Sequence, residues 1–107
     1  QNCIKYILSK SYPLSYINCE KVFYINKVLK RYDVVVYNSS GGVELLVECK
    51  SPEIKINKDH FDQVMRYNIE LKSKRIIVTN GIENYYFNFN KKTKEYIQEK
   101  DLINYSR

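Results

Sequence analysis

Glu48 and Lys50 are the residues whose types and spacing most clearly suggest chemistry. They lie two positions apart in a mostly apolar run, residues 43–50, and side chains two apart in a strand point to the same face. An unpaired charge is costly to bury inside a sheet, so two charges on one face of a central strand need an explanation. A site that uses a carboxylate together with an ammonium group would provide it.

Asp33 is a second acid that could join this site. It is the only acid in the β-branched run at residues 32–37, and the segment between the two runs, residues 38–42, is rich in Asn, Ser and Gly. This pattern predicts a β-hairpin. Since the start of the first strand faces the end of the second, Asp33 should fall close to Glu48.

Such a cluster suits a hard divalent cation. Mg²⁺ takes one or two carboxylates, carbonyl or water oxygens and a substrate phosphate, so we expect Mg²⁺ (or Mn²⁺) at Asp33 and Glu48, with the Cys49 carbonyl as a third ligand. The cation would activate a water and neutralise charge on a phosphodiester, while Lys50 would stabilise developing charge or orient the nucleophile. The reaction expected from these residues is phosphodiester hydrolysis.

Gln63 and Tyr67 form a second polar pair. They lie four residues apart and therefore on one face of a helix, where an amide and a phenol could reach phosphate oxygens or a metal-bound water. Taken alone, this pair would be a solvent residue and a core aromatic. An isolated acid-x-Lys would likewise be a surface ion pair, so the functional interpretation depends on the combination of features.

The elements that must position these residues predict an α/β domain, with a mixed β-sheet flanked by helices. We expect one domain over residues 1–107, whose N-terminal helix is truncated at Gln1. Asn57 is expected to cap the start of the helix at 59–72. The expected elements are a helix tail at 3–10, one strand at 16–29 with an irregular end at 26–27 (the alternative is a short helix there), strands at 32–37 and 43–50, a helix at 59–72, strands at 75–79 and 85–89, and a polar tail at 92–103.

Composition narrows the class of protein. Lys and Arg number 18 against 12 Asp and Glu, a net charge of +6, which favours polyanionic partners such as DNA. No apolar run is long enough for a membrane span, so we expect no membrane association and a cytoplasmic location. The three cysteines form no C-x-x-C pair and are expected to be reduced thiols. No G-x-x-x-x-G-K-[ST] loop occurs, so ATP should not bind this chain.

Together these motifs resemble the PD-(D/E)XK nuclease superfamily, and within it the N-terminal nuclease domain of type I restriction enzyme R subunits, in stand-alone form. The resembling segments are residues 30–37 (KRYDVVVY), 45–52 (LLVECKSP), 61–67 (FDQVMRY) and 77–81 (IVTNG). The resemblance implies a restriction-endonuclease-like fold and Mg²⁺-dependent cleavage of DNA.

For individual residues, the resemblance implies that Asp33 and Glu48 are metal ligands and Lys50 is the catalytic lysine. Gln63 and Tyr67 would be the accessory pair. Family members often carry an acid on the first helix, whereas this chain has none before Glu20. That contribution is therefore expected to lie upstream or to be absent.

Three hypotheses follow from the sequence. The first is a metal-dependent DNA endonuclease that uses Asp33, Glu48 and Lys50, with a homodimer as one way to bring two active sites to one duplex. The second is a catalytically inactive, nuclease-derived module that binds nucleic acid or a partner protein. The third is a small domain whose charge cluster is structural.

Overall fold

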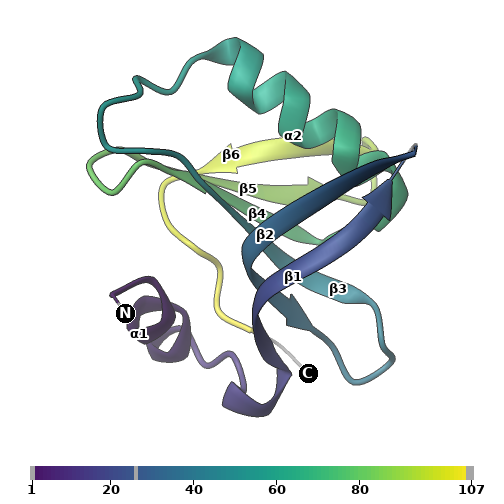
Figure 1. The fold of residues 1–107 in the computed structure, drawn as a ribbon. Coiled ribbons are helices and arrows are strands. Elements are labelled where there is room, and N and C mark those ends of the chain that lie inside the picture. Colours follow the sequence, from purple (N-terminus) through teal and green to yellow (C-terminus); the bar gives the residue numbers. More distant parts are fainter. Residues whose placement is uncertain (1, 26, 106–107) are drawn as a thin grey trace.

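The computed structural model describes residues 2–25 and 27–105, in which a six-stranded sheet lies between two helices (Figure 1). The strands lie in sequence order across the sheet, and β3 and β4 are parallel while the other pairs are antiparallel. The predicted fold class, a mixed sheet flanked by helices, is confirmed. The elements are α1 (Asn2–Ser9), a 3₁₀ turn (Leu14–Tyr16), β1 (Ile17–Ile25), β2 (Val28–Tyr37), β3 (Val43–Cys49), α2 (Lys58–Leu71), β4 (Arg75–Thr79), β5 (Asn84–Asn90) and β6 (Glu95–Glu99).

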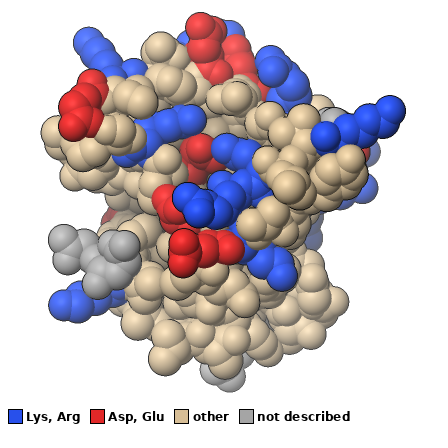
Figure 2. Space-filling model, in the orientation of Figure 1, with Lys and Arg blue, Asp and Glu red and all other residues tan. Residues whose placement is uncertain are grey.

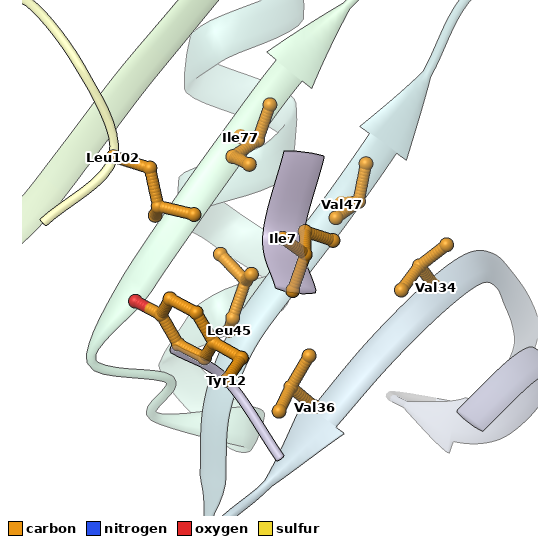
Figure 3. Packing of buried hydrophobic residues seen from close by; sticks show 8 residues of the cluster. All are labelled: Ile7, Tyr12, Val34, Val36, Leu45, Val47, Ile77 and Leu102. Carbon is orange, nitrogen blue, oxygen red and sulfur yellow. The ribbon is translucent and has the colours of Figure 1, made fainter. Parts of the chain in front are cut away.

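The two faces of the sheet bury different sets of apolar side chains. Ile7 of α1 packs on one face, where alternate residues of β2, β3 and β4 form the larger cluster (Figure 3). Val64 of α2 packs on the other face against Ile76 and Val78. The helix α2 is also the crossover that parallel strands β3 and β4 require. The cluster in Figure 3 consists of Ile7, Tyr12, Val34, Val36, Leu45, Val47, Ile77 and Leu102.

The start of α2 is set by a local hydrogen-bonding motif. The Asn57 side chain accepts a hydrogen bond from the backbone N–H of His60, and the His60 ring accepts one from the backbone N–H of Asn57. This reciprocal capping satisfies two N–H groups that a helix start would otherwise leave without partners. The predicted helix and its cap at Asn57 are confirmed, and His60 has a structural role here. No helix in the part of the chain that the structure describes is long and apolar enough to cross a membrane.

Two of the predicted element boundaries were wrong. The single strand expected at 16–29 is divided at 26–27, where an irregular end was expected, because β1 ends at Ile25 and β2 begins at Val28. Lys27 has a φ of 67°, a turn conformation that a continuous strand does not contain; Asn26 lies outside the described residues. The tail expected at 92–103 contains β6, which pairs antiparallel with β5. Its apolar residues do not alternate, so the backbone of β5, rather than a sequence pattern, specifies this edge strand.

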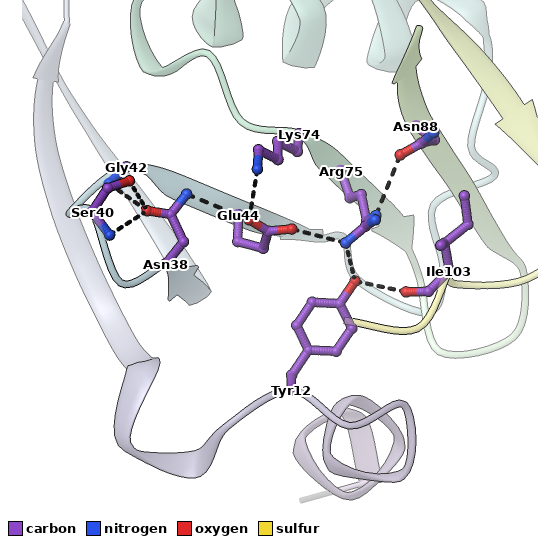
Figure 4. Close-up of polar contacts among 9 residues, drawn as sticks. All are labelled: Tyr12, Asn38, Ser40, Gly42, Glu44, Lys74, Arg75, Asn88 and Ile103. Carbon is purple, nitrogen blue, oxygen red and sulfur yellow. Dashed lines mark hydrogen bonds and ion pairs between the residues drawn. The ribbon is translucent and has the colours of Figure 1, made fainter. Parts of the chain in front are cut away.

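A buried polar network joins five parts of the chain: the segment after α1, strands β3, β4 and β5, and the C-terminal segment (Figure 4). The Arg75 guanidinium lies 2.8 Å from the Glu44 carboxylate and donates to Tyr12 Oη at 3.1 Å and to Asn88 Oδ1 at 3.3 Å. Tyr12 Oη in turn donates to the Ile103 carbonyl at 2.8 Å. Burial raises the pKa of Tyr12 to about 12, although Arg75 lowers it. These contacts fasten the segment after α1 and the C-terminal segment to the sheet.

Candidate active site at the end of strand β3

The Glu48 carboxylate is buried between two lysines. Only 6% of Glu48 is exposed. Lys30 Nζ on β2 lies 3.1 Å from both carboxylate oxygens, and Lys50 Nζ lies 3.3 Å from Oε2. The Oε1 atom nevertheless accepts no hydrogen bond within the described residues. The predicted proximity of Glu48 and Lys50 is therefore present, and a second ammonium group accompanies them.

Two tyrosines surround Lys30. Its Nζ lies 5.3 Å from the centre of the Tyr32 ring and 5.5 Å from that of Tyr67, within cation–π range. Burial, the charge of Glu48 and the neighbouring Tyr67 together raise the pKa of Tyr32, so its phenol stays protonated at neutral pH. Tyr67 of α2 thus lies beside the lysine that pairs with Glu48.

Strand β2 changes the direction of its side chains near Asp33. Tyr32 packs with Val35 and Leu46 on the α2 face, whereas Val34 packs on the α1 face. Residues two apart in a regular strand share a face, so the alternation is broken between Tyr32 and Val34. Figure 1 shows β2 bending as it crosses the sheet. This bend decides where the Asp33 carboxylate points.

Asp33 lies close to Cys49 and makes no ion pair with Lys30 or Lys50, both of which pair with Glu48. The pKa of the Cys49 thiol is raised to about 12, first by desolvation and then by hydrogen bonding to Asp33 and the charge of that carboxylate. The pKa of Cys3 on α1 is raised by burial and, to a smaller extent, by Asp33. The hairpin register pairs Val34 with Val47, and its continuation would set Asp33 opposite Glu48. A single cation position for both carboxylates stays a prediction.

A pocket of about 670 Å³ lies on the Asp33 side of β3. Asp33, Cys49 and Lys50 line it together with Cys3 and Tyr6 of α1. Lys50 therefore connects the two halves of the site, because its side chain also forms the ion pair with Glu48. Acidic and basic side chains gather in the middle of the face drawn in Figure 2, where β2 crosses the view in Figure 1.

Asn80 holds the backbone around Lys50. Its side-chain amide donates to the Ile54 carbonyl at 2.7 Å, and its Oδ1 accepts from the N–H groups of Ile82 and Glu83. The backbone N–H of Lys50 donates to the Thr79 carbonyl at 2.7 Å. The Asn80-Gly81 turn thereby fastens the loop after β3 to the end of β4.

Gln63 and Lys30 show what the sequence did not predict. Gln63 is exposed and lines a surface hollow near the start of α2 with His60 and Arg66. No described contact joins Gln63 to the Glu48 cluster.

Lys30 is the residue of the site that could not be identified from the sequence. Its only signal was its place three residues before Asp33, and alternation in a straight strand would have put the two on opposite faces.

The donor set fits a hard cation better than a soft one. The described residues contain no group of three or more His, Cys, Asp and Glu side chains arranged to hold a metal, as a structural zinc site would need. Mg²⁺ is commonly held by one or two carboxylates, with waters and substrate phosphates completing its shell. Glu48, with a buried oxygen that lacks a hydrogen bond, and Asp33 can supply those carboxylates.

Comparison with known proteins identifies the family. Searches of curated proteins and of solved structures gave no significant match. A family model described as type I restriction enzyme R protein N terminus (HSDR_N) matches residues 1–102, which include every element of the described fold. The chain therefore belongs to the family of type I restriction enzyme R protein N-terminal domains.

Proposed function

We propose that this domain hydrolyses phosphodiester bonds of DNA with a divalent cation, as a member of the PD-(D/E)XK nuclease superfamily. The observation that carries the proposal is the buried Glu48 carboxylate, held 3.3 Å from the Lys50 ammonium where β3 ends. Membership of a restriction enzyme family supports a nuclease-related role. The net charge of +6 supports a polyanionic substrate.

Glu48, Asp33 and the Cys49 carbonyl are the proposed ligands of the cation. When bound, Mg²⁺ or Mn²⁺ supplies Lewis acidity at the phosphate and lowers the pKa of a coordinated water. Among the residues that the structure describes, Glu48 Oε1 accepts no hydrogen bond, although Lys30 Nζ lies 3.1 Å from it. Asp33 makes no ion pair with another described residue. Both acids therefore have coordination capacity.

Lys50 carries the proposed electrostatic role. Its side chain lies between the Glu48 carboxylate and the pocket that Asp33 lines, where an ammonium can neutralise a phosphate oxygen and orient the attacking water. Tyr67 lies beside Lys30 and would contact the DNA backbone, while Gln63, exposed one turn nearer the start of α2, would be a more distant phosphate ligand.

A second function, DNA binding without cleavage, is favoured by two contacts. Lys30 neutralises the Glu48 carboxylate from 3.1 Å at both oxygens, and Asp33 is engaged with the Cys49 thiol. A lysine that occupies the position of a cation would leave a basic surface able to hold phosphates but unable to activate water. This alternative predicts DNA binding without cleavage in the assay described next.

The test is DNA cleavage in Mg²⁺ or Mn²⁺ by the wild-type chain and by the variants Asp33→Asn, Glu48→Gln and Lys50→Met. We expect cleavage by the wild type and a loss of at least about 100-fold in each variant, since Asp33 and Glu48 would hold the cation and Lys50 would neutralise a phosphate oxygen. Lys58→Met is the matched control, because Lys58 is 85% exposed at the start of α2, and it should cut normally.

The outcomes separate the two functions. Salt-sensitive DNA binding by all proteins, without cleavage in either cation, would favour the binding module. Cleavage that survives Glu48→Gln would contradict the proposed site. Binding of Mn²⁺ measured by calorimetry on the wild type and on Glu48→Gln gives a readout that does not depend on activity.

A further inference from the structure

A second pocket lies away from the Glu48 site, between the C-terminal half of α2 and strands β5 and β6. Its volume is about 550 Å³, within the range of ligand-binding pockets. Met65 and Ile69 of α2 face Phe89 of β5 and Tyr96 of β6 across it. It shares no lining residue with the pocket that contains Asp33, so the two can be tested separately.

The polar groups in this pocket are already paired with one another. The Asn68 amide donates to Tyr96 Oη, which donates to the Ser73 carbonyl. Asn68 Oδ1 accepts from both the backbone N–H and the hydroxyl of Ser73, at 2.9 and 2.7 Å. A ligand entering the pocket therefore finds few free hydrogen-bonding groups and mainly apolar surface.

Four basic side chains and no acidic ones are among the lining residues: Arg66, Lys72, Lys74 and Lys94. Lys74 lies 3.6 Å from Glu44, whereas the other three make no ion pair within the described part of the chain. The apolar pocket is thus surrounded by cations whose charge is available to a partner. Ile69 adds an apolar side chain that is 70% exposed.

We propose that this pocket binds an acidic peptide segment of a partner protein, which inserts one large apolar side chain between α2 and strands β5 and β6. The acidic residues of the segment pair with Arg66, Lys72 and Lys94. A nucleic acid base is a poorer occupant, because its polar edge would lose water where Asn68 and Ser73 offer no free partner. An aliphatic or aromatic side chain has no such penalty, and Met65 can adapt to its shape.

Met65 makes a direct test possible, because it is the only methionine of the chain. A ¹³C-methyl-methionine label therefore gives one NMR signal, located at the pocket. The probe is a short peptide of Asp and Glu residues around a single Phe, and the comparison is the same peptide with Ala in place of Phe. We expect the Phe peptide to shift the Met65 signal saturably and to bind at least tenfold more tightly than the Ala peptide.

Charge reversal tests the basic residues. Lys72→Glu combined with Lys94→Glu should weaken the Phe peptide at least tenfold, and added salt should weaken it in the wild type. Lys5→Glu combined with Lys27→Glu makes a charge change of the same size at two exposed lysines outside the pocket and should have no effect. Circular dichroism spectra that match the wild type would establish that the charge-reversed protein is folded.

Three results would overturn the proposal. The Phe and Ala peptides could bind equally, which would mean that the pocket is not used. A single-stranded oligonucleotide could shift the Met65 signal when the peptide does not, which would assign the pocket to nucleic acid. Decanoate could do the same, which would assign it to a small apolar acid. None of these results depends on whether the Glu48 site cleaves DNA.

Discussion

Replacing Glu44 with Gln should destabilise the fold strongly, because it leaves the charge of Arg75 buried without its carboxylate. Glu44 is 2% exposed and Arg75 is 8% exposed, and they lie 2.8 Å apart. The remaining partners of the guanidinium, Tyr12 Oη and Asn88 Oδ1, are neutral. Removing one member of a buried pair leaves the other charge uncompensated, at a cost of about 3 kcal/mol or more.

The expected change in melting temperature follows from chain length. An unfolding entropy of about 2.1 cal/mol/K per residue gives about 0.22 kcal/mol/K for a chain of 107 residues. A loss of about 3 kcal/mol therefore lowers Tm by roughly 13 °C. The measurement is thermal and urea unfolding followed by circular dichroism, analysed as a two-state transition.

Asp62→Asn is the matched control, since it makes the same carboxylate-to-amide change in an exposed pair. Asp62 lies 3.0 Å from Lys58, and these side chains are 51% and 85% exposed, so its loss should cost less than about 0.5 kcal/mol. A double variant, Glu44→Met with Arg75→Met, should be more stable than Glu44→Gln because no buried charge remains. If Glu44→Gln lowers Tm no more than Asp62→Asn does, burial does not govern this ion pair.

Two further predictions concern the candidate site and the helix that covers it. Lys30→Met removes the ammonium that lies 3.1 Å from both Glu48 oxygens. The affinity for Mn²⁺, measured by calorimetry, should therefore rise about fivefold, equivalent to about 1 kcal/mol. A lower affinity would mean that Lys30 supports the cation rather than competing with it. Asn57→Ala removes the acceptor for the His60 N–H and should lower the free energy of unfolding, measured in urea, by about 1 kcal/mol. Asn57→Ser keeps a side-chain acceptor and should retain most of that stability. Equal stability of all three proteins would contradict the capping role.

The parts of the fold that could be predicted from sequence are those that depend on local interactions. The turn between β2 and β3 follows from Asn38 and the glycines after it, because Asn38 Oδ1 accepts from the N–H groups of Ser40 and Gly42. The start of α2 follows in the same way from Asn57. Strand β6 could not be predicted, because an edge strand is stabilised by backbone hydrogen bonds to β5 that any sequence can make.

The same distinction between local and long-range interactions applies to the candidate site. Glu48 and Lys50 were predictable as neighbours because side chains two apart share a face in any extended backbone. The position of Asp33 beside Cys49 and the arrival of Lys30 at Glu48 were not, because both depend on the bend in β2 and on how Tyr32 packs against the other face of the sheet.

By itself, therefore, the amino-acid sequence determined which residues can carry charge to the end of β3, where the turns lie and which helix covers the site. Only the tertiary structure decided which of those charges meet. It pairs Glu48 with Lys30 and Lys50 and turns Asp33 towards Cys49. The physical reason is that side-chain direction along a regular strand is a local matter, whereas contact between strands depends on register, bending and the packing of the whole core.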